Sequence, residues 1–305
     1  MEFVATIDSA FEARADHSVR VSDYIALLKP KVMSLVVFSA LAGIVLAPGV
    51  QNVHPVILFT ALLSVAIGAG AAGAINMWYD RDIDAVMART KNRPVPAGQV
   101  NADEALAFGV ILALFSVMMM GMATNWIAAG WLAFSIFFYV MIYTMGLKRR
   151  TPQNIVIGGA AGAFPPVIGY AAVTGDVSIL SGALFALIFF WTPPHFWALA
   201  LFMRDDYARA KVPMMPNVVG VRATQVQMLL YTLILLPISV LPTFLGATGM
   251  IYGAAAFGLT ALFILSAARV LRAAPDDQKP ARAMFGFSIL YLFTLFALMM
   301  IDKVS

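Results

Sequence analysis

The sequence predicts an all-α polytopic membrane protein, built as one domain with nine transmembrane helices. Its composition, the spacing of its apolar runs and its one-sided charge support this prediction. Of the 305 residues, 61% are hydrophobic and only 12% are charged, with a mean hydropathy of +0.86. Such a chain carries too little charge to cover a soluble globule of its size. It contains no cysteine, which excludes disulfides and thiol chemistry.

Nine apolar runs follow one another along the chain, each long enough to cross a hydrocarbon core roughly 30 Å thick. They are Tyr24–Leu46, His54–Trp78, Asp103–Ala123, Asn125–Leu147, Asn154–Thr174, Ile179–Phe202, Thr224–Leu245, Met250–Leu271 and Ala281–Ile301. We therefore expect a single membrane domain over residues 24–305. Residues 1–23 are rich in acids and lack the apolar stretch of a signal peptide, so we expect a short cytoplasmic tail.

Basic residues mark one side of the predicted membrane domain. Every Lys and Arg except Lys303 lies before the first span, at its start, or in or within about three residues of the connections after the second, fourth, sixth and eighth spans. The positive-inside rule then predicts a cytoplasmic N-terminus and an external C-terminus. Because one span more or fewer would scramble this bias, the bias supports a count of nine. The net charge of +4 thus reflects topology, and we expect no nucleic-acid partner.

Three polar side chains at the end of the second span predict a metal site. Asn76, Asp80 and Asp84 are spaced four residues apart, which places them on one face of a helix. Acids at a membrane boundary are costly and usually mark an ion or proton site. Oxygen ligands without nitrogen or sulfur suit Mg²⁺, which also takes phosphate oxygens. The alternative is an ordinary solvated helix end with compensating charges.

Basic residues and a second acidic cluster lie on the same predicted side. Bases beside a metal site are what a diphosphate needs. Asp205 and Asp206 follow the sixth span, and we expect Asp206, then Asp205, to add metal ligands. The bases we expect to bind diphosphate are Arg81, Arg89, Lys91, Arg93, Lys148, Arg149, Arg209 and Lys211.

His195 lies deep in the sixth span, directly after Pro193 and Pro194. We expect the prolines to bend or break the helix there. The histidine then either bonds backbone groups that the prolines free, or contacts a buried acceptor molecule as a ligand or acid/base. The small-residue stretches 68–73 and 158–163 leave a similar choice between tight helix packing and room for a bulky ligand.

The motif Asn76-x3-Asp80-x3-Asp84, in a chain with nine spans, resembles the UbiA-type membrane prenyltransferases. Longer strings look like the heme branch of that family, the protoheme IX farnesyltransferases. The likeness runs from about Asp23 to Gly220. Its strings are Leu28–Lys31, Tyr79–Pro94, Tyr143-Thr144 with Lys148-Arg149 and Thr151, Asn154–Pro166, Trp191–Trp197 and Asp205–Pro216. One departure is the second acidic motif, where adjacent Asp205 and Asp206 stand in place of two acids four residues apart.

The resemblance implies that nine helices surround a central cavity open to the cytoplasmic side of a bacterial inner membrane. It implies transfer of a farnesyl group from farnesyl diphosphate to a vinyl group of heme B, with addition of water, giving heme O and diphosphate. Mg²⁺ would be held by Asn76, Asp80 and Asp84, with heme B as a substrate and His195 as a heme contact. Heme A synthase and oxidase-assembly proteins are the protein partners that it suggests.

Two other functions remain open from the sequence. A UbiA-type enzyme could prenylate a quinone precursor or a chlorin, although the strings around Trp191–Trp197 favour heme. A membrane transporter would place its binding residues near the bilayer midplane, often at broken helices. The acids here lie at helix ends instead.

Overall fold

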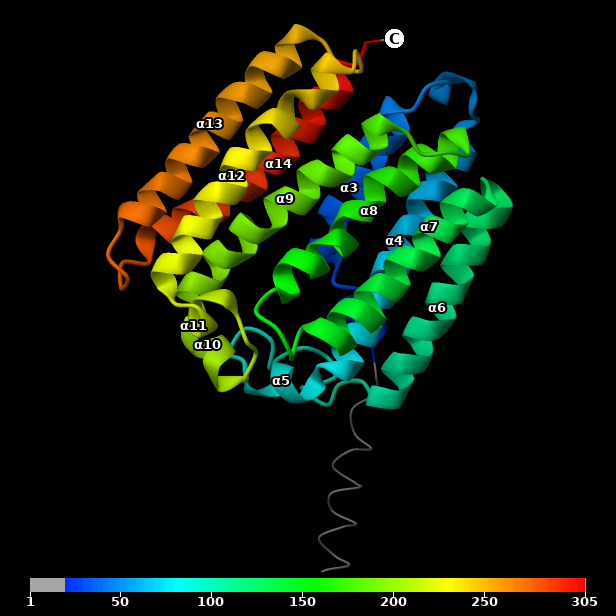
Figure 1. Ribbon diagram of the computed structural model, residues 1–305. Helices are drawn as coiled ribbons and strands as arrows, with labels where there is room; N and C mark the ends of the chain where they lie inside the picture. Colours follow the sequence, from blue (N-terminus) through cyan, green and yellow to red (C-terminus); the bar gives the residue numbers. More distant parts are fainter. Residues whose placement is uncertain (1–19, 305) are drawn as a thin grey trace, which may run out of the picture.

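The computed structural model describes residues 20–304, which fold into one helical bundle without a named β-strand in that range (Figure 1). Most of the predicted tail lies outside the described residues. The long helices, in chain order, are α3 (Pro30–Leu46), α4 (Pro55–Tyr79), α6 (Ala102–Ala123), α7 (Trp126–Phe137), α8 (Asn154–Thr174), α9 (Ile179–Phe202), α12 (Val221–Phe244), α13 (Met250–Arg272) and α14 (Lys279–Ile301). The shorter elements are α2 (Val21–Leu27), a 3₁₀ turn at Val50–Asn52, α5 (Arg81–Val86), α10 (Arg204–Arg209) and α11 (Met215–Val218).

Seven of the nine predicted spans agree with one long helix each, to within about three residues at each end. Within residues 20–304, eight helices are long and apolar enough to cross a membrane. The fourth span combines α7 with a π-helical segment, η2 (Phe138–Leu147). The first span corresponds to a bent pair, α2 and α3, which meet at 59°; counted as one span, this pair brings the number of candidate spans in the described residues to nine.

The bend in the first span follows from its local sequence. Pro30 opens α3 at a position where its missing N–H costs nothing. Lys29, the residue before it, adopts a left-handed conformation with φ 53° and ψ 59°. Because few residues other than glycine tolerate that conformation, the turn at Lys29 is under backbone strain.

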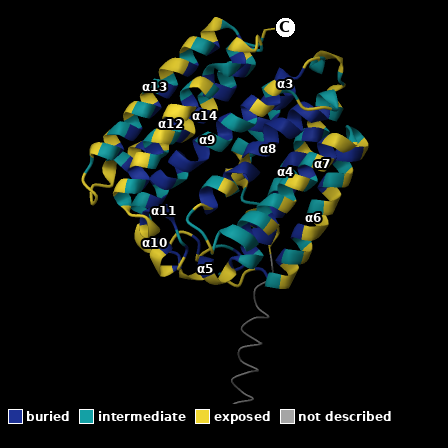
Figure 2. Cartoon of the chain, viewed as in Figure 1, coloured by how far each residue is buried: buried dark blue, intermediate teal, exposed yellow. Residues whose placement is uncertain are grey.

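Helix α8 forms the centre of the bundle and is the most buried of the spans (Figure 2). It packs against α3, α7 and α9. Two glycines bring α3 and α8 into backbone contact: a Cβ at Gly169 would lie 2.1 Å from the Ala40 carbonyl oxygen, and one at Gly43 would lie 2.0 Å from that of Pro166. Close backbone approach of this kind is how helices associate in lipid, where apolar burial gives no net drive.

The small-residue stretches mostly serve helix packing. A Cβ at Gly68 would lie 2.9 Å from a methyl carbon of Leu132, and a Cβ at Gly159 would lie 2.9 Å from the methyl carbon of Thr192. Gly162 differs, because a Cβ there would meet nothing within 4 Å. Helix α9 continues through Pro193 and Pro194, so the expected break is absent.

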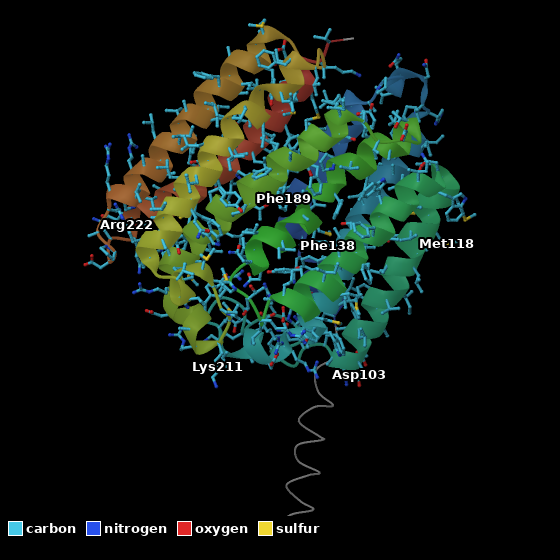
Figure 3. The ribbon with its side chains drawn as sticks, viewed as in Figure 1. Asp103, Met118, Phe138, Phe189, Lys211 and Arg222 are labelled. Atoms are coloured by element: carbon cyan, nitrogen blue, oxygen red, sulfur yellow. The ribbon has the colours of Figure 1, made fainter. Side chains whose placement is uncertain are left out.

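The helix ends divide the bundle into two faces. The charged end, which we define by α5, α10 and α11, also carries Asp103 and Lys211 (Figures 1 and 3). At the opposite end the chain terminates beside the start of α13. There Lys303 Nζ donates to the Val45 carbonyl oxygen at 2.7 Å, and a β-bridge joins Thr248 to Lys303. The last span is thereby fastened to the first.

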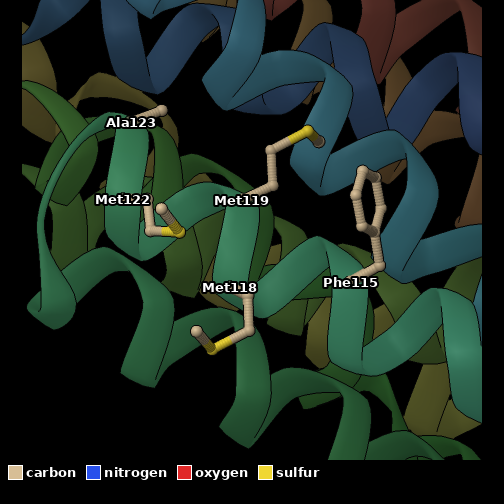
Figure 4. Close-up of a pocket in the computed structure, with 5 residues that line it drawn as sticks. All are labelled: Phe115, Met118, Met119, Met122 and Ala123. Carbon is tan, nitrogen blue, oxygen red and sulfur yellow. The ribbon is translucent and has the colours of Figure 1, made fainter.

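An apolar groove lies on the outer side of α6 (Figure 4). Phe115, Met118, Met119, Met122 and Ala123 line it, and none of them is charged. Met122 is 79% exposed. An uncharged, exposed stripe on a helix of this hydropathy is a surface suited to lipid chains.

Substituting Gly169 by alanine should destabilise the bundle, since the new methyl group would meet the backbone of α3. Overpacking of this kind costs about 1–3 kcal/mol. Gly162→Ala is the matched control on the same helix and should leave stability unchanged or slightly raised. Thermal unfolding of both variants in one detergent checks this; equal melting temperatures would contradict the close approach.

Candidate active site

The predicted triad lies at the junction between α4 and α5 and is buried. Asp80 caps the C-terminus of α4, and its N–H donates to the Asn76 carbonyl oxygen at 2.9 Å. The Asp84 N–H donates to the Asp80 carbonyl oxygen at 2.8 Å, which carries the helical spacing across the junction. Asn76, Asp80 and Asp84 are 3%, 0% and 2% exposed. Two carboxylates so deeply buried require compensating charge.

Cations from two separate segments supply that charge. Lys148 forms an ion pair with Asp80. Arg149 reaches the other oxygen of Asp80 at 3.4 Å. Arg93 Nη1 lies 2.6 Å from Asp84 Oδ2. The structure therefore brings together Arg93, Lys148 and Arg149 from the predicted set of bases.

A π-helical segment brings Lys148 and Thr144, four residues apart, to the triad. Both belong to η2 or its C-cap, and the Lys148 N–H bonds the Tyr143 carbonyl five residues back, at 2.9 Å. The wide turns of a π-helix occur often at functional sites. Thr144 Oγ1 accepts a hydrogen bond from Asn76 Nδ2 at 3.1 Å. The unusual helix thus connects the fourth span to the second at the site.

Arg149 has a stronger partner that the sequence pattern did not identify. Its guanidinium donates to both oxygens of Asp82, at 2.7 and 2.6 Å, and lies over the Tyr79 ring at 4.8 Å. These bonds lower the pKa of Asp82 and raise that of Arg149, because each stabilises the charged form of the other. Arg149 Nε is buried and has no partner among the described residues, so the guanidinium retains a free donor.

The second acidic cluster meets the first at the charged end. Ile83 and Met87, in and just after α5, share an apolar cluster with Tyr207 of α10. Asp206 is 6% exposed, pairs with Arg209 through Oδ1, and leaves Oδ2 buried without a partner among the described residues. Asp205 is exposed. Burial therefore favours Asp206 over its neighbour.

Several predicted bases lie outside this group. Arg81 is exposed, donates to the Trp78 carbonyl oxygen at 2.7 Å and lies over the Trp78 ring. Arg89, Lys91 and Lys211 are also exposed. By contrast, Lys29 is half-buried and reaches the triad: its Nζ donates to Asn76 Oδ1 at 2.7 Å. In the sequence Lys29 was counted only as a topological charge, and its place in the string Leu28–Lys31 was the signal that could have identified it.

His195 bonds a side chain, and no backbone group, in α14. Its Nδ1 lies 2.6 Å from Ser288 Oγ. The Ser288 hydroxyl hydrogen is committed to the Phe285 carbonyl oxygen at 2.6 Å, so Nδ1 must donate. The neutral ring then carries its lone pair on Nε2, which has no partner among the described residues. Trp191 and Phe285 stack on the ring, at 4.2 and 4.6 Å between centroids.

The donor set fits Mg²⁺ with a diphosphate. No group of three or more His, Cys, Asp or Glu side chains in the described part of the chain lies close enough to hold a metal alone. Mg²⁺ needs only one or two carboxylates when phosphate oxygens and waters complete its shell. Unpartnered Asp206 Oδ2 suits a cation, and unpartnered Arg149 Nε suits an anion.

Known proteins resemble this chain in sequence and in fold. A model of the UbiA prenyltransferase family matches residues 36–290. A protoheme IX farnesyltransferase of Methylocella silvestris is 56% identical over 306 residues, covering 100% of this chain and 96% of its own. That of Parvibaculum lavamentivorans is 59% identical over 283 residues, with coverage of 92% and 88%.

Solved structures of other proteins share the fold of this chain at lower sequence identity. One described as a digeranylgeranylglyceryl phosphate synthase is 18% identical, with a TM-score of 0.77 over 92% of this chain and 98% of its own. A UbiA homologue from Archaeoglobus fulgidus bound to DMAPP and Mg²⁺ is 17% identical, with a TM-score of 0.66 over 90% and 99%. Identity this low shows the fold alone. From the matched family model and these close relatives, the chain belongs to the UbiA prenyltransferase family.

Proposed function

We propose that this chain is a Mg²⁺-dependent farnesyltransferase that acts on heme B. The farnesyl C–O bond of farnesyl diphosphate breaks, a C–C bond forms to a heme vinyl group, and water adds to the other vinyl carbon with loss of a proton. The products are heme O and diphosphate. The observation that carries the proposal is the 56–59% identity to protoheme IX farnesyltransferases over most of the chain.

The buried triad is the part of the site that we assign to the metal. Asn76, Asp80 and Asp84 would hold Mg²⁺, joined by Asp206 and, less directly, by exposed Asp205. The bound ion would stabilise the negative charge that develops on the departing diphosphate. Bound Mg²⁺ and DMAPP in the Archaeoglobus fulgidus homologue support a site of this kind in the same fold.

The bases would bind the diphosphate. Arg93, Lys148, Arg149 and Arg209 already lie beside the acids. They can exchange a carboxylate for a phosphate oxygen without moving far, and preorganised charge costs no reorganisation during reaction. We assign the exposed Arg81, Arg89, Lys91 and Lys211 a weaker role in attracting the anion. An apolar space between the helices would exclude water from the farnesyl cation until it meets the vinyl group.

Purified protein incubated with heme B, farnesyl diphosphate and Mg²⁺ should form heme O, detected by mass spectrometry. Asp80→Asn and Asp84→Asn should each lower turnover at least about 100-fold, because a carboxylate that we assign to the metal loses its negative charge. Asp103→Asn, an exposed acid at the same end, is the control and should retain activity.

Prenylated 4-hydroxybenzoate as the preferred product would establish the aromatic-acceptor alternative. Full turnover in the Asp80 and Asp84 variants would contradict the metal assignment. Removal of Mg²⁺ by EDTA should stop the reaction, and added Mg²⁺ should restore it.

We assign His195 to contact with heme B, through its free Nε2 lone pair. His195→Ala should therefore weaken the affinity for heme B, measured by titration of the heme absorption band, and leave the affinity for farnesyl diphosphate unchanged. Ser288→Ala keeps the ring but removes the group that fixes its tautomer, so its effect should be smaller. Unaltered heme affinity in His195→Ala would reduce the histidine to a packing role.

We further propose that the charged end faces the cytoplasm of a bacterial inner membrane. Because the chain has no cysteine, single cysteines can report this directly. In intact spheroplasts, Gln51→Cys on the opposite end should react with a membrane-impermeant maleimide, whereas Asp103→Cys should react only after lysis. The reverse pattern would invert the topology. Heme A synthase and oxidase-assembly proteins remain proposed partners.

A further inference from the structure

Lys29 reaches the predicted metal site from the bend in the first span. Its Nζ donates to Asn76 Oδ1 at 2.7 Å, although Asn76 lies on α4. The same Asn76 amide donates to Asp80 Oδ2 at 2.7 Å, so one side chain links the amine to the buried carboxylate. The left-handed backbone at Lys29, with φ 53°, places the amine there at a cost in strain.

The surrounding groups fix the orientation of the Asn76 amide. A lysine ammonium can only donate hydrogen bonds, and an ionised carboxylate can only accept them. The amide oxygen therefore faces Lys29, while Nδ2 faces Asp80 Oδ2 at 2.7 Å. Nδ2 also donates to Thr144 Oγ1 at 3.1 Å. With Lys29 in place, the amide presents its nitrogen to Asp80.

Metal binding requires the opposite orientation. Mg²⁺ takes oxygen ligands, so Asn76 can share an ion with Asp80 only if Oδ1 turns toward that carboxylate. Turning the amide directs Nδ2 at Lys29. Two groups that only donate cannot bond each other, so Lys29 must then find another acceptor. A diphosphate arriving with the metal is rich in acceptors and negative charge.

We propose that Lys29 and Mg²⁺ use Asn76 Oδ1 alternately, and that Lys29 passes to the diphosphate when the metal takes that oxygen. Lys29 is thereby a further substrate-binding residue of the site. It also discourages the site from taking Mg²⁺ alone, because the ion must displace a cation that is held in place. The inference rests on the proposed Mg²⁺–diphosphate function.

Isothermal titration of the purified full chain with Mg²⁺ alone, and with inorganic diphosphate in excess Mg²⁺, tests the exchange. In Lys29→Met the affinity for Mg²⁺ alone should rise roughly three- to tenfold, because a competing cation is gone. The affinity for Mg²⁺-diphosphate should fall about tenfold, because a charge-assisted contact is lost. Effects of opposite sign are not expected from general damage to the fold.

Three variants serve as controls. Lys29→Gly removes the amine while accepting the left-handed backbone, so it should show the same two changes in affinity. It therefore keeps the test available if Lys29→Met folds poorly. Lys29→Arg keeps the charge and should stay near the unsubstituted protein in both titrations. Lys279→Met, at an exposed lysine at the start of α14, should change neither.

Any other pattern overturns the exchange: two affinities that fall together indicate a structural role, and unchanged affinities place Lys29 outside the site. The proposed function fails separately. It is contradicted if the unsubstituted protein binds neither Mg²⁺ nor Mg²⁺-diphosphate, or if Asp84→Asn binds both as well as the unsubstituted protein does.

Discussion

The neutralisation of Asp80 is the interaction on which the organisation of the charged end depends. Its carboxylate is fully buried, and its cations come from beyond the fourth span, through Lys148 and Arg149. Removing one partner of a buried pair costs about 3–5 kcal/mol, because the remaining charge stays buried. The second and fourth spans must therefore meet at this point. The π-helical turn of η2 and the hydrogen bond from Asn76 to Thr144 are arranged around that meeting.

Most of the fold could be predicted because the signals are long and independent. An apolar run near 20 residues has few structural solutions in lipid, and the one-sided distribution of Lys and Arg supported a count of nine. What the pattern could not predict is short-range geometry. The left-handed backbone at Lys29 leaves no mark in the apolar periodicity, and the same periodicity does not distinguish the π-helix before Lys148 from an α-helix. The predicted central cavity stays a prediction.

The structure brings together part of the predicted site, and its two departures from the prediction have different causes. Residue type and spacing identified Asn76, Asp80, Asp84 and Asp206, all of which are buried. Spacing cannot tell which way a base points from a helix end, so Arg81 was grouped with Lys148 although it lies on Trp78. Lys29 was missed for another reason: because its charge fits the positive-inside rule, it was interpreted as a topology signal alone and not as a site residue. Burial separates the two cases.

The fastening of Lys303 to the carbonyl groups at the end of α3 closes the bundle opposite the charged end. With the bent pair counted as one span, the described residues hold nine candidate crossings, and an odd number would put the two ends of the domain on opposite sides of a membrane. A second copy joined directly after Lys303 would start on the wrong side and would have to insert upside down. Under that topology, gene fusion with a partner of the same orientation would need an extra crossing in the linker.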